Sequence, residues 1–428
     1  MNPPLSRRRF LRASAAATAL AAGPRLHAAA EGEPVTVGVM GLNGRGTELV
    51  TELAATGRVQ VTWLVDPDVR ALEKGQQALA GKQPRPPRTD KDFRRILEDR
   101  RTEALVIAAP DHWHAPASLL ALAAGKAVYV EKPLSHNPRE GELLAAAVKR
   151  TRGVLQMGVQ RRSLPWVAEA IQKVRGGELG EVYVARAWYV NRRDTIGFGQ
   201  LGLVPDGLDY ALWQGPAPDR PFKDNLIHYN WHWFWHWGTG ELGNNGVHLL
   251  DLARWGLGVE CPSRVASGGG RYFFDDDQET PDSQAVTFDF GGEKLIQWEH
   301  RSSQPTPLDG ATHGVQFLGT RASLLLDDTG WRIRDLDGKE VARGEGQVAT
   351  APHLANFLDA VRNRARTLTA DAEQAQLSTL MCHLGNIAQR LGRNLTLNPK
   401  ERRVAGTDRE VAALWTREYR PGWEPAGL

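Results

Sequence analysis

Two residues of this chain, Lys132 and His248, could move a proton or hold a charge on a substrate. Lys132 follows an apolar run at 127–130, and His248 follows a turn rich in glycine and asparagine at 243–246. A lysine removed from water beside other cations has a lowered pKa and can hydrogen-bond a substrate hydroxyl. A neutral histidine can accept a proton near pH 7. A single histidine among apolar residues is more often a buried core residue than a catalytic one. The surrounding sequence is therefore needed to distinguish the two roles.

The residues before His248 suggest how its charge is controlled. Gly243-Asn244-Asn245 is a plausible helix cap, and the sequence VHLLDLARW continues with helical periodicity. We therefore expect His248 in the first turn of a helix, where the positive end of the helix dipole disfavours an imidazolium. This placement predicts a neutral imidazole that can act as a base.

A glycine turn near the start of the chain has the features of a dinucleotide site. In GLNGRG (41–46) an asparagine stands in the middle place, so the motif alone is degenerate, but an apolar run precedes it and a helical pattern follows. Asp66 ends the next apolar run, and a carboxylate there accepts hydrogen bonds from a ribose diol and repels a 2′-phosphate. We predict NAD, with NADP less favoured; a glycine turn that binds no nucleotide is the alternative. The predicted contacts of the turn are Gly41, Asn43, Gly44, Arg45 and Gly46.

The first part of the chain alternates between strand and helix patterns. Continuous apolar strands separated by helices indicate a parallel sheet covered on both faces, which is a doubly wound Rossmann fold. The expected strands are 35–41, 59–66, 103–110, 127–133 and 154–160, and the expected helices are 44–56, 68–80, 114–124 and 138–151.

After residue 160 the pattern changes to strands with few helices between them. Gly291-Gly292 joins two of these strands as a hairpin, so we expect an α/β domain with a large, predominantly antiparallel sheet. The expected strands are 181–190, 284–290, 294–301, 315–320 and 323–328, and helices are expected at 353–364 and 371–393. We divide the chain into a leader (1–30), a nucleotide-binding domain (31–160) and a substrate domain (161–428).

Charge and cysteine content exclude several classes of protein. The first 30 residues hold five arginines and no acid, which leaves 48 basic and 50 acidic residues in the other 398 positions of this 428-residue chain. No basic run remains there that would suggest nucleic acid or a membrane surface as partner. The two cysteines are too few for a disulfide framework or a metal cage.

The leader has the pattern of an export signal. SRRRFLR (6–12) matches the twin-arginine motif, and the run ASAAATALAAG (13–23) is too short to anchor the protein permanently in a membrane. We predict removal of residues 1–30 after passage through the twin-arginine translocase, and a periplasmic location. An arginine-rich disordered tail is the alternative.

The stretch WHWFWHW (231–237) alternates tryptophan with other residues. Alternation is typical of a strand face, and indole rings also bind the apolar faces of sugars. Because the stretch leads directly into the turn before His248, we expect it to line the substrate site. His232 and His236 are candidate substrate contacts. A metal site made from these two and Asp251 lacks a tight ligand pattern, so no metal is predicted.

Four stretches resemble the Gfo/Idh/MocA family of oxidoreductases. They are the glycine turn, PDHWHAP (110–116), AGKAVYVEKP (124–133) and GNNGVHLLDLARW (243–255); WHWFWHWG and CHLGNIAQRLGR (382–393) resemble an exported bacterial branch. The resemblance implies a Rossmann domain followed by an open antiparallel sheet through which relatives often pair, so we expect a homo-oligomer.

The resemblance also assigns roles to residues. Lys132 corresponds to the family's catalytic lysine and His248 to its catalytic histidine. Pro110, His114, Glu131 and Lys132 would contact the cofactor. Two positions depart from the family: Asp111 replaces a frequent asparagine, and Asn244 replaces the usual aspartate. Asp251, one turn further on, could supply the missing acid.

We therefore expect an enzyme that oxidises a hydroxyl of a carbohydrate or polyol and holds NAD(H) tightly for recycling in place. His248 would take the hydroxyl proton while Lys132 stabilises the alkoxide. Recycling could use a second sugar, or a redox-neutral scheme that cleaves a glycoside with Tyr189 as an extra base. A periplasmic sugar-binding protein without turnover is the remaining alternative. The predicted substrate contacts are Lys132, Arg161, Arg162, Trp235, Asn244, His248 and Asp251.

Overall fold

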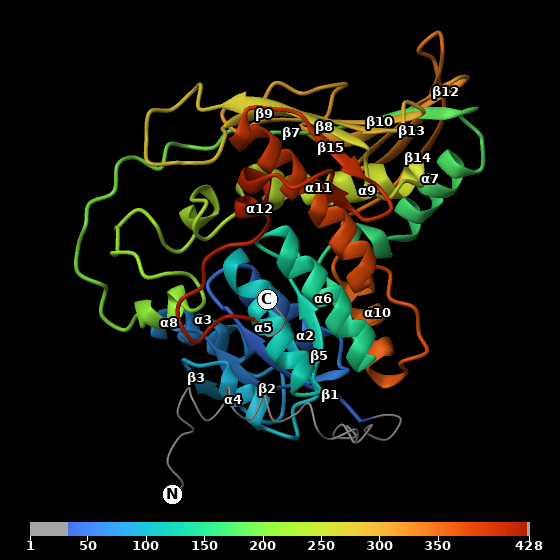
Figure 1. The fold of residues 1–428 in the computed structure, drawn as a ribbon. Coiled ribbons are helices and arrows are strands. Elements are labelled where there is room, and N and C mark those ends of the chain that lie inside the picture. Colours follow the sequence, from blue (N-terminus) through green and yellow to red (C-terminus); the bar gives the residue numbers. More distant parts are fainter. Residues whose placement is uncertain (1–32, 426–428) are drawn as a thin grey trace, which may run out of the picture.

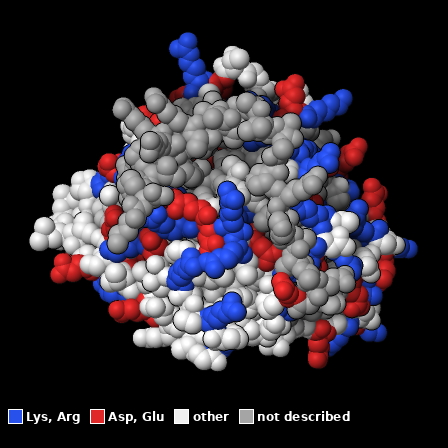
Figure 2. Space-filling model, turned by 90° about the horizontal axis from the view of Figure 1, so that it is seen from below, with Lys and Arg blue, Asp and Glu red and all other residues white. Residues whose placement is uncertain are grey.

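The computed structural model describes residues 33–425, in which one sheet lies above another with helices between them (Figure 1). The predicted export leader lies outside the described residues. Within residues 33–425 no helix is long and apolar enough to cross a membrane. Figure 2, the view from below, shows basic and acidic side chains intermixed on that face.

The lower sheet is parallel and has the strand order β3-β2-β1-β4-β5-β6. Its strands are β1 (Val35–Met40), β2 (Val59–Val65), β3 (Arg88–Asp90), β4 (Ala104–Ile107), β5 (Ala127–Val130) and β6 (Leu155–Met157). β1, β4 and β5 lie in the middle of the sheet and are almost wholly buried, which is why they read as continuous apolar runs. The expected doubly wound fold is confirmed; β3 was missed because its three residues are polar.

Helices cover this sheet. They are α2 (Arg45–Ala55), α3 (Val69–Leu79), α4 (Arg94–Glu98), α5 (Asp111–Ala123) and α6 (Pro138–Thr151). Two of them, α3 and α6, begin at side-chain caps. The Asp68 side chain accepts from the amide of Arg70 at the start of α3, and the Asn137 side chain accepts from the amide of Glu140 at the start of α6. α5 begins three residues earlier than expected, directly after Pro110.

The upper sheet has ten strands in the order β14-β13-β12-β11-β7-β10-β9-β8-β15-β16. Its strands are β7 (Val182–Val190), β8 (Arg264–Gly270), β9 (Ser283–Phe290), β10 (Lys294–Arg301), β11 (His313–Gly319), β12 (Ala322–Asp327), β13 (Gly330–Asp335), β14 (Glu340–Glu345), β15 (Leu395–Asn398) and β16 (Arg403–Val404). β7 and β10 pair in parallel, and the other described pairs are antiparallel. The expected hairpin of β9 and β10 and the mostly antiparallel sheet are confirmed.

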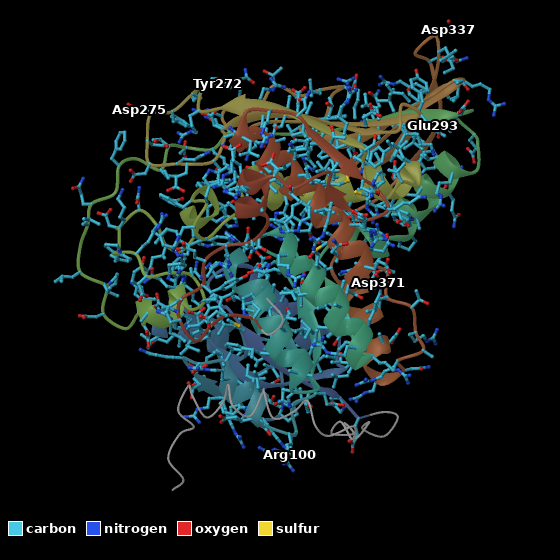
Figure 3. All side chains as sticks on the ribbon, in the orientation of Figure 1. Arg100, Tyr272, Asp275, Glu293, Asp337 and Asp371 are labelled. Atoms are coloured by element: carbon cyan, nitrogen blue, oxygen red, sulfur yellow. The ribbon has the colours of Figure 1, made fainter. Side chains whose placement is uncertain are left out.

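Helices lie on the side of the upper sheet that faces the Rossmann domain (Figure 1). They include α7 (Pro165–Arg175), α9 (Val247–Leu257) and α11 (Ala372–Leu391), and the short helices α8 (Tyr210–Gln214) and α12 (Arg409–Trp415) lie further out. α11 begins at Asp371, labelled in Figure 3, whose side chain accepts from the amides of Glu373 and Gln374. Because α11 contacts both β8 and α6, it is buried along most of its length.

One helix of the second half returns to the first domain. α10 (Ala351–Arg362) places Leu354, Phe357 and Leu358 in the same apolar core as β1 and β2. The Phe357 ring packs against the edge of Tyr129, with centroids 5.7 Å apart. The strands of the lower sheet end before residue 160, and those of the upper sheet begin after it. The domain boundary at residue 160 is still a prediction.

The tryptophan stretch is not a strand, so the strand interpretation of its alternation is wrong. Asn230–Trp233 form a 3₁₀ helix and a turn follows. The backbone makes isolated contacts instead of a ladder; for example, the Trp237 carbonyl accepts from the amide of His112. Trp231, Phe234 and Trp237 enter a separate apolar cluster with Trp213.

The close packing of α9 against the upper sheet can be tested by adding a methyl group at their contact. A Cβ added at Gly256 would lie 2.2 Å from Cε1 of Phe317, a fully buried ring of β11. We expect Gly256→Ala to lower the free energy of unfolding by about 1–3 kcal/mol, because the core must shift to admit a methyl group. Thermal unfolding measures the effect. Gly268→Ala is the control, since no atom lies within 4 Å of its added Cβ; equal melting temperatures for the two variants would contradict this packing.

Candidate active site

A cavity of about 530 Å³ lies where β1, β4 and β5 end, with the second domain forming its other wall. Ligands of doubly wound sheets bind at these strand ends. Most of the predicted cofactor and catalytic residues line it. They are Gly41, Asn43, Gly44, Arg45, Asp66, Pro110, His114, Glu131, Lys132, Asn244 and His248.

The glycine turn fits a pyrophosphate. Gly41 has a φ of +87°, and a Cβ there would lie 2.5 Å from the Ala108 carbonyl oxygen. Gly46 lets α2 approach the turn, since its Cβ would lie 1.7 Å from the Gly41 oxygen. Around Gly44 the space within 4 Å is open, and no side chain caps α2. The start of α2 therefore offers unshielded backbone N–H groups to an anion.

Asp66 lies at the wall of the cavity with a fixed carboxylate. Its Oδ2 accepts from the amide of Leu42 at 2.8 Å and its Oδ1 from the amide of Asp68 at 2.9 Å. Burial raises the pKa of Asp66 to about 6 although these hydrogen bonds oppose the shift. Its position fits a ribose diol. The neighbouring Asn43 accepts from Lys74 Nζ at 2.8 Å.

Arg45 and Glu131 form an ion pair at the edge of the cavity. Arg45 Nε lies 2.9 Å from Glu131 Oε1, and its Nη2 donates to the Thr350 hydroxyl at 3.2 Å. Thr350 directly precedes α10, so the pair also ties the second half of the chain to the cofactor end of the cavity.

Lys132 meets Asn244 across the two domains. Lys132 follows β5, and its Nζ donates to Asn244 Oδ1 at 2.7 Å. Burial lowers the pKa of Lys132 although Asp111, Glu131 and Glu241 attract its charge. A cation held in this way can donate to a substrate oxygen and stabilise negative charge on it.

Asp111 supports this contact from the Rossmann side. The Thr239 hydroxyl donates to Asp111 Oδ2 at 2.6 Å, and burial raises the pKa of Asp111. His114, one turn along α5, has its two ring nitrogens against the carbonyl oxygens of Ala109 and Pro133. The imidazole therefore braces the loop that carries Lys132.

His248 lies in the cavity wall and, as expected, in the first turn of α9, but this turn is not a free helix end. A π-helical turn, Leu242–Gly246, runs without a break into α9, and Gly246 has helical dihedral angles (φ −58°). The dipole of a free helix end therefore does not act on His248. Burial, together with the charges of Arg161, Lys132 and Arg45, lowers its pKa well below the usual value. The imidazole is neutral at pH 7, for a different reason than expected.

Four predicted substrate contacts lie away from the cavity lining. Arg161 binds Asp328 at 2.7 Å, and the Trp235 ring lies 4.9 Å below the Arg390 guanidinium. Arg162 Nε lies 2.6 Å from Asp251 Oδ2, and both side chains are buried. Asp251 also accepts from Ser378 at 2.5 Å, so it does not replace the acid missing at position 244. The four residues are Arg161, Arg162, Trp235 and Asp251.

The second domain contributes cavity residues that the sequence did not identify. These residues are Trp213, His228 and Tyr229. Their only sequence signal is the density of aromatic residues in this region. Trp231 and His232, which belong to the tryptophan stretch, also line the cavity, as expected. His236 instead lies against the Pro218 carbonyl and is not part of the lining.

A second ion pair borders the cavity and was also missed. Arg193 Nε lies 2.8 Å from Glu241 Oε2, and its Nη1 donates to the Tyr229 hydroxyl at 2.9 Å. The guanidinium lies over the Trp233 ring, 4.7 Å from its centroid. Arg193 thereby positions the aromatic wall beside Lys132. Residues 33–425 contain no group of three or more His, Cys, Asp or Glu residues placed to hold a metal ion.

Comparison with known proteins identifies families and relatives that this chain resembles. A model described as "Oxidoreductase family, NAD-binding Rossmann fold" matches residues 35–159, and one described as "Oxidoreductase family, C-terminal alpha/beta domain" matches residues 195–321. A "Glycosyl hydrolase family 109 protein" of Stenotrophomonas maltophilia is 33% identical over 355 residues, which cover 74% of this chain and 73% of the relative.

Other matches are shorter or more distant. The scyllo-inositol 2-dehydrogenase (NAD(+)) of Bacillus subtilis is 30% identical over 54% of this chain and 57% of that enzyme. Some further curated dehydrogenases match over about a third of their length. The crystal structure of aldose-aldose oxidoreductase from Caulobacter crescentus complexed with glycerol has a TM-score of 0.66 at 19% identity, over 85% of this chain and 100% of that one.

The parallel Rossmann sheet and the second, α/β domain agree with these matches. Structural neighbours with the same fold were solved with NAD or NADH. The chain belongs to the Gfo/Idh/MocA family of NAD-dependent oxidoreductases.

Proposed function

We propose that this enzyme oxidises a hydroxyl of a carbohydrate or polyol and retains its NAD(H) between turnovers. The observation that carries the proposal is the position of Lys132 and His248 in the wall of the cavity that also contains the glycine turn. Bound NAD supplies the hydride acceptor; the protein supplies orientation and proton transfer. Sugar and inositol dehydrogenases among the relatives support this substrate class.

The two residues have complementary tasks. His248 is neutral and accepts the proton of the substrate hydroxyl. Lys132, oriented by Asn244, donates a hydrogen bond to the oxygen on which negative charge develops. The carbon of that hydroxyl then loses its hydride and becomes a carbonyl.

A periplasmic location is part of this proposal. The twin-arginine pattern at residues 6–12 supports export of the folded protein. Outside the cytoplasm no pool reoxidises NADH, so a cofactor that stays bound must be restored by the same enzyme. The open face of the upper sheet, on which no described helix lies (Figure 1), is compatible with pairing of two copies.

The second candidate function is redox-neutral cleavage of a glycoside. It is favoured by the glycosyl hydrolase relative, a match that extends over most of both chains. Transient oxidation of a sugar carbon would acidify the neighbouring C–H; loss of that proton would break the glycosidic bond by elimination, water would add, and the carbonyl would be reduced again. Tyr189 could be the extra base, although burial raises the pKa of its phenol.

The first test identifies the cofactor. We expect mature protein purified from the periplasm to release close to one NAD or NADH per chain on denaturation, as measured by mass spectrometry. The same preparation would then be assayed for oxidation of free sugars and for cleavage of glycosides. A protein that is purified without nucleotide and does not bind added NAD would refute the proposal.

Lys132→Met separates an enzyme from a sugar-binding protein. We expect turnover to fall by about 10²–10⁴-fold, because the substrate oxygen loses its charged donor. NAD content should stay near that of the wild type. Lys82→Met, at an exposed lysine far from the cavity lining, is the matched control. Wild-type turnover in the Lys132 variant would remove this lysine from the mechanism.

Asn244→Asp tests the electrostatics of the contact. A carboxylate 2.7 Å from the ammonium would raise the pKa of Lys132, which burial lowers in the native protein. Activity that needs a protonated Lys132 should therefore persist to higher pH in the variant. The pH profile of kcat measures the shift, with Asn398→Asp in β15 as control. An unchanged alkaline limb would mean that another group controls it.

A further inference from the structure

Part of the second domain lies directly on the Rossmann domain. Residues 207–232, which we name the cover, include α8, and Figure 1 shows α8 beside α3. The Gly207 carbonyl accepts from the amide of Val69 at 3.3 Å and from Lys91 Nζ at 3.2 Å. The Asp209 amide donates to the Pro67 carbonyl at 2.9 Å. The cover is thus joined to the loop that follows β2, next to Asp66.

Side chains of the cover form the wall opposite the glycine turn. His228 Nε2 lies 2.8 Å from Asp68 Oδ2, at the fully buried carboxylate that caps α3. The Trp213 carbonyl accepts from Trp113 Nε1 at 2.9 Å and lies 3.1 Å from His112 Nε2. Trp213 and His228 line the same cavity as Gly44. A dinucleotide on the glycine turn would be enclosed between the two domains.

The C-terminal tail, residues 416–425, also reaches this region. In Figure 1 the chain runs from α12 down to the Rossmann domain and passes close to α8. Arg417 donates to the buried Glu140 through Nε at 2.9 Å, and its Nη2 donates to the His112 carbonyl at 2.7 Å. That carbonyl is available because Pro116, four residues on in α5, has no N–H to donate to it. Arg417 therefore anchors the tail to the Rossmann domain.

Three residues later the tail binds the cover. Arg420 Nη1 lies 2.8 Å from Asp219 Oδ1, and Nη2 donates to the Ala211 carbonyl at 2.8 Å. The Arg420 amide donates to the Pro216 carbonyl at 3.0 Å. Trp423 packs edge-on against Trp113, with ring centroids 5.1 Å apart. The tail thus connects α5 and the cover through one short segment.

We infer that the cover is the outer wall of the NAD site and that the tail fastens it, so that bound nucleotide leaves only when the contacts of Arg420 break. The inference rests on the proposed retention of NAD(H) and gives that retention a structural cause. On this inference, release requires the cover to move, because Trp213 and His228 of the cover line the cavity together with the glycine turn.

Variants on both sides of the Arg420 contact test the inference. In the full-length, NADH-loaded enzyme, Arg420→Met should raise the rate of NADH dissociation about tenfold, which corresponds to about 1.4 kcal/mol. Asp219→Asn should raise the same rate by a smaller factor, because the contact of Arg420 with the Ala211 carbonyl remains and an exposed ion pair contributes little. Dissociation is followed by the loss of NADH fluorescence on mixing with excess NAD. The double variant should release NADH little faster than Arg420→Met, because the two residues share one contact. Asp219 is 68% exposed, so its substitution leaves the core intact if Arg420→Met fails to fold.

Arg393→Met is the matched control. Arg393 forms ion pairs with Asp408 and Glu410, at the start of α12 and away from the cavity. Its NADH dissociation rate should equal that of the wild type. Equal rates in the wild type and in the folded Arg420 and Asp219 variants would overturn the inference and leave the proposed reaction intact. A wild-type protein that binds no nucleotide would overturn both.

Discussion

The contact of Lys132 with Asn244 is the constraint on which the site depends. An ammonium group away from water must have acceptors close to it, and here the nearest acceptor comes from the other domain, 2.7 Å away. The loop after β5 and the π-helical turn before α9 must therefore keep a fixed position relative to each other. Any change in the position of the two sheets would leave the cation without its partner.

The acidic groups near this cation are themselves restrained. Glu131 is paired with Arg45, Glu241 with Arg193, and Asp111 accepts from Thr239. Because each of these acidic side chains is held by its own partner, none of them forms a direct ion pair with the Lys132 ammonium. The pKa of Lys132 stays lowered, and that of Asp111 stays raised, by burial. Such opposed shifts are a feature of catalytic sites.

Local patterns in the sequence predicted those features of the structure that depend on neighbouring residues, such as strands, turns and their order. The apolar runs became the central strands, and Gly41 and Asp66 lie where a strand–turn–helix unit must place them. Lys132 and His248 were singled out mainly through the resemblance to the family, and both line the cavity. The residues Gly243-Asn244-Asn245, predicted as a cap, instead lie in a π-helical turn that runs into the helix of His248.

Long-range pairing explains the errors at the substrate side. Arg162 and Asp251 are 89 residues apart in the sequence, and nothing near either residue shows that they form a buried ion pair. Arg161 is likewise taken up by Asp328. Trp213 and His228 were missed because their role depends on a segment that folds back onto another domain. Alternating tryptophans gave a strand pattern, but side-chain packing in a separate cluster determined their conformation.

The return of α10 to the first domain has a consequence for how the chain is made. β1, β2 and β5 are synthesised early, yet their apolar layer includes Phe357 and Leu358, which leave the ribosome some 200 residues after β6. Until then this apolar layer, to which α2 and α3 also contribute, lacks the side chains of α10, and Tyr129 lacks the ring of Phe357 against which it packs. The nucleotide site therefore matures late, when nearly the whole polypeptide is present, and the first domain is not a unit that completes its own interior.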